Sequence, residues 1–244
     1  MSRLATFAVI SKIVNMLLKG LQKLTLLDFP GRLAATVFVG GCNFRCPFCH
    51  NASLVLPEKF GPTLPEEEFF SFLSSRLGKL TGVCVSGGEP TLHPEIADFL
   101  RRIKNMGLAV KLDTNGYRPD VLESLIDEGL VDYVAMDIKN SPERYGETVG
   151  LRSFDVEPIK KSVEILLSGR VDYEFRTTVM RELHTEDDIR KMGKLCRGAK
   201  KYFLQSFRDS GDLIGEGFSA YSEAEMAGLQ KTLAEFVPFA QIRG

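Results

Sequence analysis

Strand-like and helix-like segments alternate along most of this 244-residue sequence, and that order limits the possible folds more than any other feature. Short apolar runs rich in Val, Ile, Thr and Phe indicate buried strands, and each precedes a longer segment with helical spacing. The expected strands are residues 33–39, 83–86, 109–113, 133–137, 171–179 and 202–205, and the expected helices are residues 66–77, 94–105, 119–128, 154–167, 186–196 and 222–236. Such an order is typical of parallel βα units.

Six βα units are too few to close a standard eight-stranded barrel. We therefore predict an α/β fold, a partial (βα)6 TIM-like barrel whose open side could admit a large substrate such as a protein loop. No repeat, low-complexity tract or long Gly/Ser/Pro linker divides the chain. One domain is expected over residues 20–244, with a short extension at residues 239–242, and residues 1–19 form an N-terminal extension of uncertain role.

The N-terminal extension includes an apolar run, residues 4–18, whose spacing fits an amphipathic helix. Lys12 and Asn15 interrupt this run, so it is too short and too polar to span a bilayer. In the alternative interpretation, Met16 is the natural start and residues 1–15 are an upstream extension without a role.

Composition narrows the classes of function. The net charge is −1 and the aromatic residues are scattered, so we expect neither nucleic acid nor an anionic membrane as a partner. The five cysteines are odd in number and three are clustered. This pattern argues against a disulfide scaffold and predicts a reducing compartment, the cytoplasm.

The three clustered cysteines are Cys42, Cys46 and Cys49, in the spacing C-x3-C-x2-C directly after the first predicted strand. Thiolates so close in sequence can converge on one soft metal centre, such as an Fe–S cluster, zinc or Cu(I). Cys84 and Cys196 are distant, each within an apolar segment. Because most structural zinc sites and simple ferredoxin clusters need a fourth protein ligand, three thiolates indicate a cluster with one iron left open.

The motif, with the aromatic Phe48 before its last cysteine, resembles the signature of the radical S-adenosylmethionine (SAM) enzymes. The longer string GGCNFRCPFCHN is similar to their glycyl-radical-activating branch. Within that branch, the chain from about residue 20 onward most resembles the activating protein of anaerobic ribonucleoside-triphosphate reductase.

The resemblance implies a 4Fe–4S cluster on the three cysteines, with its open iron chelating the amino and carboxylate groups of SAM. Reductive cleavage of SAM would give a 5′-deoxyadenosyl radical that takes a hydrogen atom from a glycine of a partner, a glycyl radical enzyme. The electron would come from a low-potential donor such as flavodoxin or ferredoxin. No general base is needed, which agrees with the lack of any Ser/His/Asp or Cys/His constellation.

Further candidate residues follow the carboxyl ends of the next strands, where parallel α/β folds place their chemistry. Gly87, Gly88 and Glu89 come directly after the second predicted strand. Adjacent glycines let the backbone turn sharply and expose its polar groups. The resemblance implies that this turn holds the methionine amino group, with Glu89 supporting it; a plain turn is the alternative.

Asp113 and Asn115 follow the third predicted strand, and their polar groups suit ribose hydroxyls. An Asx-type turn would also explain Asn115. Asp137 and Lys139 follow the fourth strand. The resemblance implies that Lys139 faces the carboxylate of the cofactor and that a monovalent cation can lie between Asp113 and Asp137. A solvated surface lysine is the alternative for Lys139.

Glu174, Arg176 and Thr178 share one face of the fifth predicted strand. In an inner strand, the cation of Arg176 must be paired or in contact with a ligand. A guanidinium suits a carboxylate in bidentate geometry, so Arg176 is our candidate for binding the methionine carboxylate. A structural ion pair with a neighbouring acid is the rival interpretation.

Three other polar residues receive no ligand role. His50 adjoins Cys49 too closely for both to bind one zinc ion, so we expect it to contact the cluster or cofactor. His184 lies at a helix start and is expected to face solvent. Gln205 ends the sixth strand, and the sequence assigns it no role.

Two alternative functions remain open. One is a radical SAM enzyme that acts on a small molecule and resembles 7-carboxy-7-deazaguanine synthase, which shares a shortened barrel and a single cluster. The other is a non-enzymatic zinc-binding module. The cysteine context favours the activase over the small-molecule enzyme, and iron and sulfide analysis would separate the zinc-binding module from both enzymes.

Overall fold

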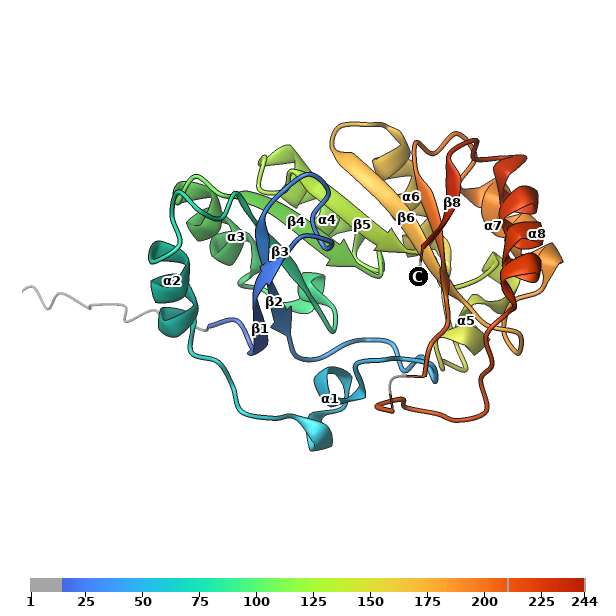
Figure 1. The fold of residues 1–244 in the computed structure, drawn as a ribbon, viewed down its shortest axis with the longest axis horizontal. Helices are drawn as coiled ribbons and strands as arrows, with labels where there is room; N and C mark the ends of the chain where they lie inside the picture. The colour runs from blue at the N-terminus through green and yellow to red at the C-terminus, as the bar shows by residue number, and fades with distance from the viewer. Residues whose placement is uncertain (1–14, 210, 244) are drawn as a thin grey trace, which may run out of the picture.

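The computed structural model describes residues 15–209 and 211–243 (Figure 1). Its strands are β1 (Leu18–Thr25), β2 (Ala34–Val39), β3 (Gly82–Gly87), β4 (Ala109–Thr114), β5 (Tyr133–Asp137), β6 (Asp172–Val179), β7 (Tyr202–Ser206) and β8 (Ala240–Arg243). Its α-helices are α1 (Ala52–Val55), α2 (Glu66–Ser74), α3 (Ile96–Asn105), α4 (Pro119–Asp127), α5 (Tyr145–Thr148), α6 (Glu157–Leu167), α7 (Glu186–Leu195) and α8 (Glu223–Ala234). The described 3-10 helices are η1 (Pro57–Lys59), η2 (Pro90–Leu92) and η3 (Pro142–Arg144).

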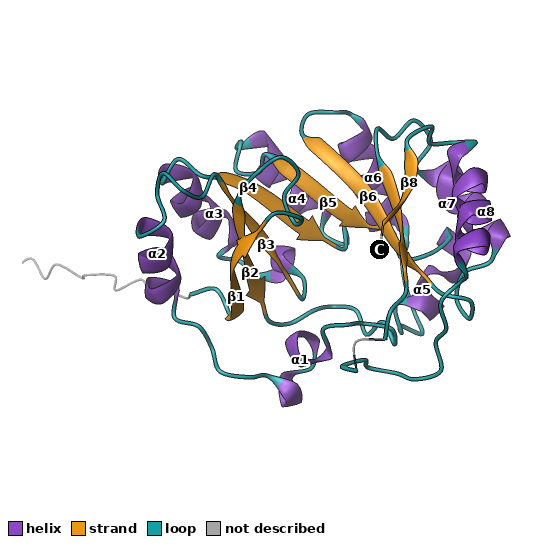
Figure 2. Cartoon of the chain, viewed as in Figure 1, coloured by secondary structure: helices purple, strands orange, loops and turns teal. Residues whose placement is uncertain are grey.

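In the described part of the chain, the eight strands form one sheet in the order β1 to β8. β1 runs antiparallel to β2, and all other neighbours are parallel. Figure 2 shows the larger helices along the outer side of the curved sheet. The six predicted strands are β2 to β7, and each is followed by one of the predicted helices. The predicted α/β fold, a partial (βα)6 TIM-like barrel, is therefore confirmed.

Strand β6 shows how the sequence builds the two faces of the sheet. Tyr173 and Phe175 are buried in the hydrophobic core. Glu174 and Arg176 alternate with them and form ion pairs with residues of other strands. The period of two in a strand thus separates an apolar layer under the helices from a polar barrel interior. This interior leads to the carboxyl ends of the strands, and the segment with the three clustered cysteines follows the carboxyl end of β2.

The two edge strands, β1 and β8, were not predicted from the sequence. β1 pairs only with β2, and Leu24 in it is 55% exposed, so its apolar residues do not alternate as in a half-buried strand. β8 lies in the segment expected only as a short extension, and Ile242 in it is 40% exposed. Backbone pairing defines both strands, and a side-chain pattern does not report backbone pairing.

The amphipathic helix expected over residues 4–18 lies largely outside the described residues. Its last residue, Leu18, begins β1. Met16 is buried, and its backbone nitrogen donates to Glu66 Oε1 at 2.5 Å. Residues 18 and 19, which the sequence prediction assigned to the N-terminal extension, therefore belong to the sheet.

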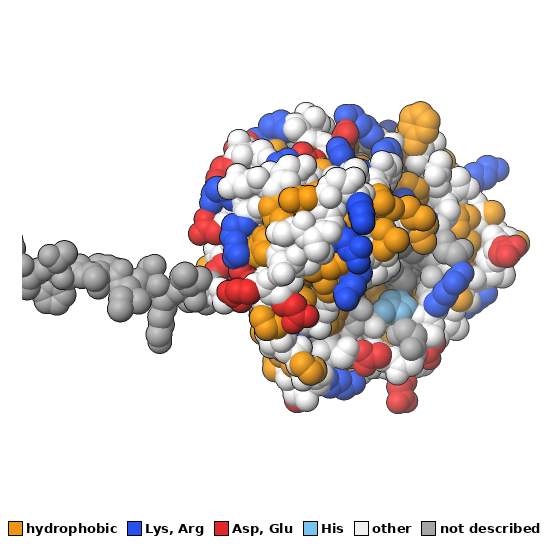
Figure 3. Space-filling model, turned by 60° about the vertical axis from the view of Figure 1, so that its left-hand side comes forward, with side chains coloured by type: hydrophobic (Ala, Val, Ile, Leu, Met, Phe, Trp, Pro, Cys, Tyr) orange, Lys and Arg blue, Asp and Glu red, His pale blue; other side chains and the backbone are white. Residues whose placement is uncertain are grey.

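Charged side chains of both signs lie on the surface (Figure 3). Lys and Arg side chains are interspersed with Asp and Glu on the face shown in Figure 3, in line with a net charge of −1. Among the residues that the structure describes, no helix is both long enough and apolar enough to cross a membrane.

Candidate active site

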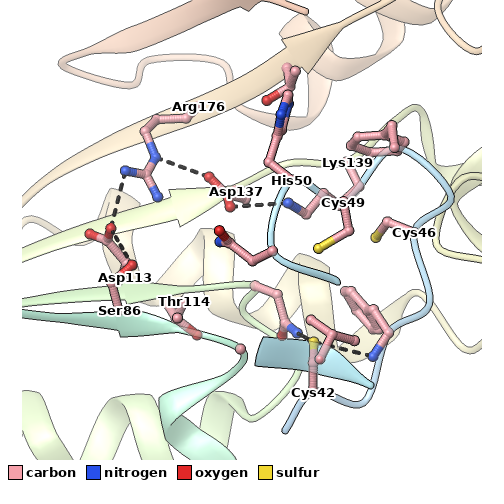
Figure 4. A pocket seen from close by; sticks show the side chains of 18 residues that line it. Cys42, Cys46, Cys49, His50, Ser86, Asp113, Thr114, Asp137, Lys139 and Arg176 are labelled. Carbon is pink, nitrogen blue, oxygen red and sulfur yellow. Dashed lines mark hydrogen bonds and ion pairs between the residues drawn. The ribbon is translucent and has the colours of Figure 1, made fainter. Parts of the chain in front are cut away.

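A cavity of about 850 Å³, including space open to solvent, lies at the carboxyl ends of the parallel strands (Figure 4). It brings together side chains from strands far apart in the sequence. Its lining residues are Cys42, Phe44, Cys46, Phe48, Cys49, His50, Asn51, Val55, Ser86, Gly87, Gly88, Asp113, Thr114, Asn115, Asp137, Lys139, Arg176 and Thr178. All predicted site residues except Glu89 are among them. The assigned roles of these residues remain predictions.

The three cysteines lie on one loop, residues 40–51, which we call the cysteine loop. The loop has little regular structure, and backbone hydrogen bonds to three other segments hold it. Glu89 N donates to Gly41 O at 2.8 Å, Arg45 N to Val149 O at 2.9 Å, and Gly215 N to Pro47 O at 2.7 Å. These contacts present the thiols to one end of the cavity, as Figure 4 shows.

The thiols are partly or fully shielded from water. Burial raises the pKa of Cys42 to about 11 and that of Cys46 to about 12. Both thiols are therefore protonated at neutral pH in the metal-free protein, and metal binding must displace their protons. Loading of a metal centre should accordingly become easier as the pH rises.

The donor set fits an Fe–S cluster. Three thiols border one cavity, and thiolates are the protein ligands that such clusters use. Within the described residues, no three His, Cys, Asp or Glu side chains are arranged to hold a single metal ion.

The end of β3 and the turn after it approach the end of β2 and the cysteine loop too closely for any side chain. Gly87 has φ +116°, and a Cβ on it would lie 2.4 Å from Val39 O. A Cβ on Gly88 would lie 1.9 Å from Gly41 O. Both glycines are needed for backbone packing beside the cavity, whatever ligand the turn binds.

Glu89 does not line the cavity and is fully buried behind it. Its Oε1 accepts hydrogen bonds from Thr91 N and Thr114 Oγ1, at 3.1 and 2.8 Å. Its Oε2 accepts from Asn115 N at 2.6 Å. Burial raises the pKa of Glu89, but each oxygen faces a backbone N–H, which can only donate. The ionised carboxylate therefore fits this site and links the β3 and β4 loops.

Glu89→Gln is expected to lower the free energy of unfolding by about 1–3 kcal/mol, because the amide nitrogen would face a backbone N–H that also donates. Chemical denaturation of the metal-free protein measures this loss. Glu164→Gln, on the exposed face of α6, is the matched control and should change stability little. Equal stability of the two variants would contradict the linking role of Glu89.

Charged side chains of alternating sign run beside the cavity, in the order Lys111, Asp113, Arg176, Asp137 and Lys139. Arg176 Nη1 lies 3.4 Å from Asp113 Oδ2, and its Nε lies 3.0 Å from Asp137 Oδ1. Lys139 Nζ donates to Asp137 Oδ2 at 3.0 Å, and Lys111 donates to Asp113. Arg176 therefore forms the structural ion pairs that were the alternative to ligand binding. It also borders the cavity.

These groups stay charged at neutral pH. Burial would raise the pKa of Asp113, but Arg176 and Lys111 outweigh it and lower that pKa to about 2. Burial would likewise raise the pKa of Asp137, and Arg176 and Lys139 together hold it below its usual value. Three cations and two carboxylates leave one net positive charge at this side of the cavity.

Lys139 is held by two buried side chains, Tyr145 and His184, to which the sequence assigned no such role. Its backbone N donates to the hydroxyl of Tyr145 at 3.2 Å, and its carbonyl lies 2.8 Å from His184 Nε2. The expectation that His184 faces solvent is wrong, since the residue is 0% exposed. Its other ring nitrogen accepts from Met180 N at 3.3 Å, an arrangement that no sequence pattern indicates.

The remaining predicted residues occupy varied positions. Phe48 is buried and packs edge-on against Phe218 at 6.4 Å. His50 borders the cavity and lies 5.6 Å from the ring of Phe207. Gln205 does not line the cavity. Asn115 Nδ2 donates to Asn43 Oδ1 at 2.8 Å, which links it to the cysteine loop.

Comparisons with known proteins assign the family. A family model described as "Radical SAM superfamily" matches residues 36–196. A protein of Methanocaldococcus jannaschii named "Putative glycyl-radical enzyme activating enzyme" is 34% identical over 235 residues, which cover 93% of this chain and 95% of that protein.

Two further comparisons agree. The pyruvate formate-lyase-activating enzyme of Clostridium pasteurianum is 29% identical over 195 residues, covering 74% of this chain and 76% of that protein. The crystal structure of QueE from Escherichia coli superposes with a TM-score of 0.57 and 14% identity, covering 93% of each chain, which shows the fold alone. With the family match spanning the cysteine loop and the strand that carries Arg176, the chain is a radical SAM enzyme, a member of the radical SAM superfamily.

Proposed function

We propose that this protein is a glycyl-radical enzyme activating enzyme. Membership in the radical SAM superfamily implies a 4Fe–4S cluster and SAM as cofactors. The observation that carries the activase assignment is the 34% identity, over 93% of the chain, to a relative that bears this name. The similarity to a pyruvate formate-lyase-activating enzyme over 74% of the chain supports it.

Cys42, Cys46 and Cys49 would hold the cluster at one end of the cavity. When bound, the cluster and SAM would supply the radical chemistry of the family, which is one-electron reductive cleavage of SAM and removal of a hydrogen atom from the substrate. The protein itself binds and orients these cofactors and excludes water from the cavity. Phe44 and Phe48 are both buried and form an apolar wall of the cavity beside the thiols.

Lys139 and Arg176 would orient the methionine carboxylate of SAM. The net positive charge beside the cavity supports this assignment, because a bound carboxylate would neutralise it. The Gly87–Gly88 turn would offer its backbone to the methionine amino group, and Asn115 its amide to the ribose. Asp113 already accepts from Lys111, Ser86 and Arg176, so its carboxylate would contribute mainly by holding Arg176.

We propose an anaerobic ribonucleoside-triphosphate reductase as the partner. This choice rests only on the resemblance of the sequence around the three cysteines. A low-potential donor such as flavodoxin or ferredoxin would supply the electron. A reducing cytoplasm suits the five cysteines, all of which are free in the structure.

The test is electron paramagnetic resonance of the partner after anaerobic incubation with the cluster-loaded protein, SAM and a low-potential reductant. A glycyl radical doublet should appear on the reductase and should be absent when Cys46→Ala replaces the intact protein. It should also be absent when the radical-bearing glycine of the reductase is replaced by alanine.

Parallel incubations separate the possible substrates. A doublet on a pyruvate formate-lyase and none on the reductase would keep the activase function and change the partner. SAM cleavage coupled to conversion of a small nucleoside or pterin precursor, without a doublet on either protein, would instead favour the small-molecule alternative.

A further inference from the structure

The position between Asp113 and Asp137 is filled by a side chain of the protein. The resemblance to activating enzymes predicts that a monovalent cation can lie between these carboxylates. In the structure, the guanidinium of Arg176 lies there instead and contacts both, at 3.4 and 3.0 Å (Figure 4). The residues present therefore do not fit a bound cation at this point.

The backbone fixes Arg176 in this position. Arg176 lies in β6, in register with Asp137 of β5, and β6 is paired on its other side with β7. Its guanidinium reaches across β5 to Asp113 of β4. One side chain thus connects three adjacent strands, and its Cα cannot withdraw without breaking the sheet.

Charge balance explains why a cation is required between the two aspartates. The side chains of Asp113 and Arg176 are each 15% exposed, and that of Asp137 is 29% exposed. Two carboxylates so shielded from water repel each other unless a cation lies between them. With Lys111 and Lys139 on the outer sides, the group already carries one excess positive charge. A metal cation added to Arg176 would double that excess.

We propose that Arg176, in addition to facing the methionine carboxylate of SAM, takes the place of a monovalent cation. It holds the two aspartates apart and ionised, and through Asp137 it fixes Lys139 for the methionine carboxylate of SAM. The intact protein then needs neither Na⁺ nor K⁺. Removal of the guanidinium leaves two facing carboxylates, which become a cation site. This inference concerns the SAM pocket and does not depend on which partner the enzyme activates.

The test compares chloride salts of tetramethylammonium, Na⁺ and K⁺ at equal ionic strength, with the cluster-loaded protein kept anaerobic. For the intact protein, the melting temperature should vary by less than about 1 °C with the cation. Its dissociation constant for SAM, from titration calorimetry, should vary by less than about twofold. A selective, saturable response of either quantity to Na⁺ or K⁺ would show a separate cation site and overturn the proposal.

Arg176→Ala should melt about 6 °C or more below the intact protein in tetramethylammonium, because a buried charge pair is broken. Na⁺ or K⁺ should restore at least about half of that shift, in a saturable way, and should strengthen SAM binding about tenfold. Arg176→Lys keeps the charge and should not respond to the cation. Arg152→Ala, on the exposed surface, controls for loss of any arginine.

Arg176→Gln is measured alongside, because it keeps more side-chain volume if the alanine variant does not fold. A folded Arg176→Ala or Arg176→Gln variant, verified by circular dichroism, that shows no selective response to Na⁺ or K⁺ would also overturn the proposal. The melting temperature reports the cation site without any measurement of catalysis. Failure of glycyl radical formation would therefore leave this result unaffected.

Discussion

Replacement of any one of Cys42, Cys46 and Cys49 by alanine is expected to reduce the iron retained after anaerobic reconstitution to background. The three thiols border one cavity, and the other two cysteines lie elsewhere in the fold. A cluster that loses one of only three protein ligands has no neighbouring thiolate to replace it. Iron and sulfide analysis, with the visible absorption of the cluster, measures the outcome.

Cys84→Ala and Cys196→Ala are the matched controls. Both thiols are fully buried, and burial raises the pKa of each well above its usual value, as expected for inert core residues. Both variants should retain the iron of the intact protein. A folded Cys84→Ala variant without iron, or a Cys46→Ala variant with full iron, would show that the ligand set is wrong.

Much of the architecture was accessible from the sequence because it depends on side-chain pattern. The strand predicted at residues 133–137 matches β5, and the helix predicted at residues 119–128 matches α4 (Pro119–Asp127) within one residue. Buried strands and amphipathic helices differ in the spacing of apolar residues, which is a local property. The placement of polar residues after each strand then predicted one shared cavity, since parallel strands end at the same edge of the sheet.

The interactions within that cavity could not be predicted, because they depend on pairs of residues distant in sequence. Glu89 reads as a ligand-binding residue in the turn after β3, yet it is buried outside the cavity lining and accepts hydrogen bonds from Thr114 and Asn115. His184 reads as a surface residue at a helix start, yet it lies against the carbonyl of Lys139. Of these interactions, only the contact between Lys111 and Asp113 was indicated by the sequence, because the two residues share the inner face of β4 by period-two alternation.

Arg176 shows how two competing interpretations can both describe one residue. The sequence set a ligand contact against a structural ion pair as alternatives. The structure pairs Arg176 with two aspartates at the edge of the cavity, so the ion pair fixes the guanidinium where a ligand carboxylate could meet it. The distinction disappears because the acids that neutralise the cation belong to the same site.

Gly88→Ala is expected to produce the largest loss of stability of any single methyl addition near the cavity. The new Cβ would lie 1.9 Å from Gly41 O and 2.6 Å from Gly41 C, which are backbone atoms that no side-chain rotation can move. Either the turn after β3 or the cysteine loop must shift, and the hydrogen bond from Glu89 N to Gly41 O would break. Overpacking and the lost hydrogen bond together should cost about 3 kcal/mol.

Gly228→Ala is the matched control, because Gly228 lies in α8 with no atom within 4 Å of an added Cβ. That variant should gain about 0.5–1 kcal/mol, since alanine favours the helix. Chemical denaturation of both metal-free proteins measures the difference, and iron content after reconstitution tests the cysteine loop separately. Gly88→Ala should lose iron as well as stability, because the displaced segment carries Cys42. If Gly88→Ala kept both its stability and its iron, the turn and the cysteine loop would have to move apart freely. Their close approach would then not hold the thiols in place.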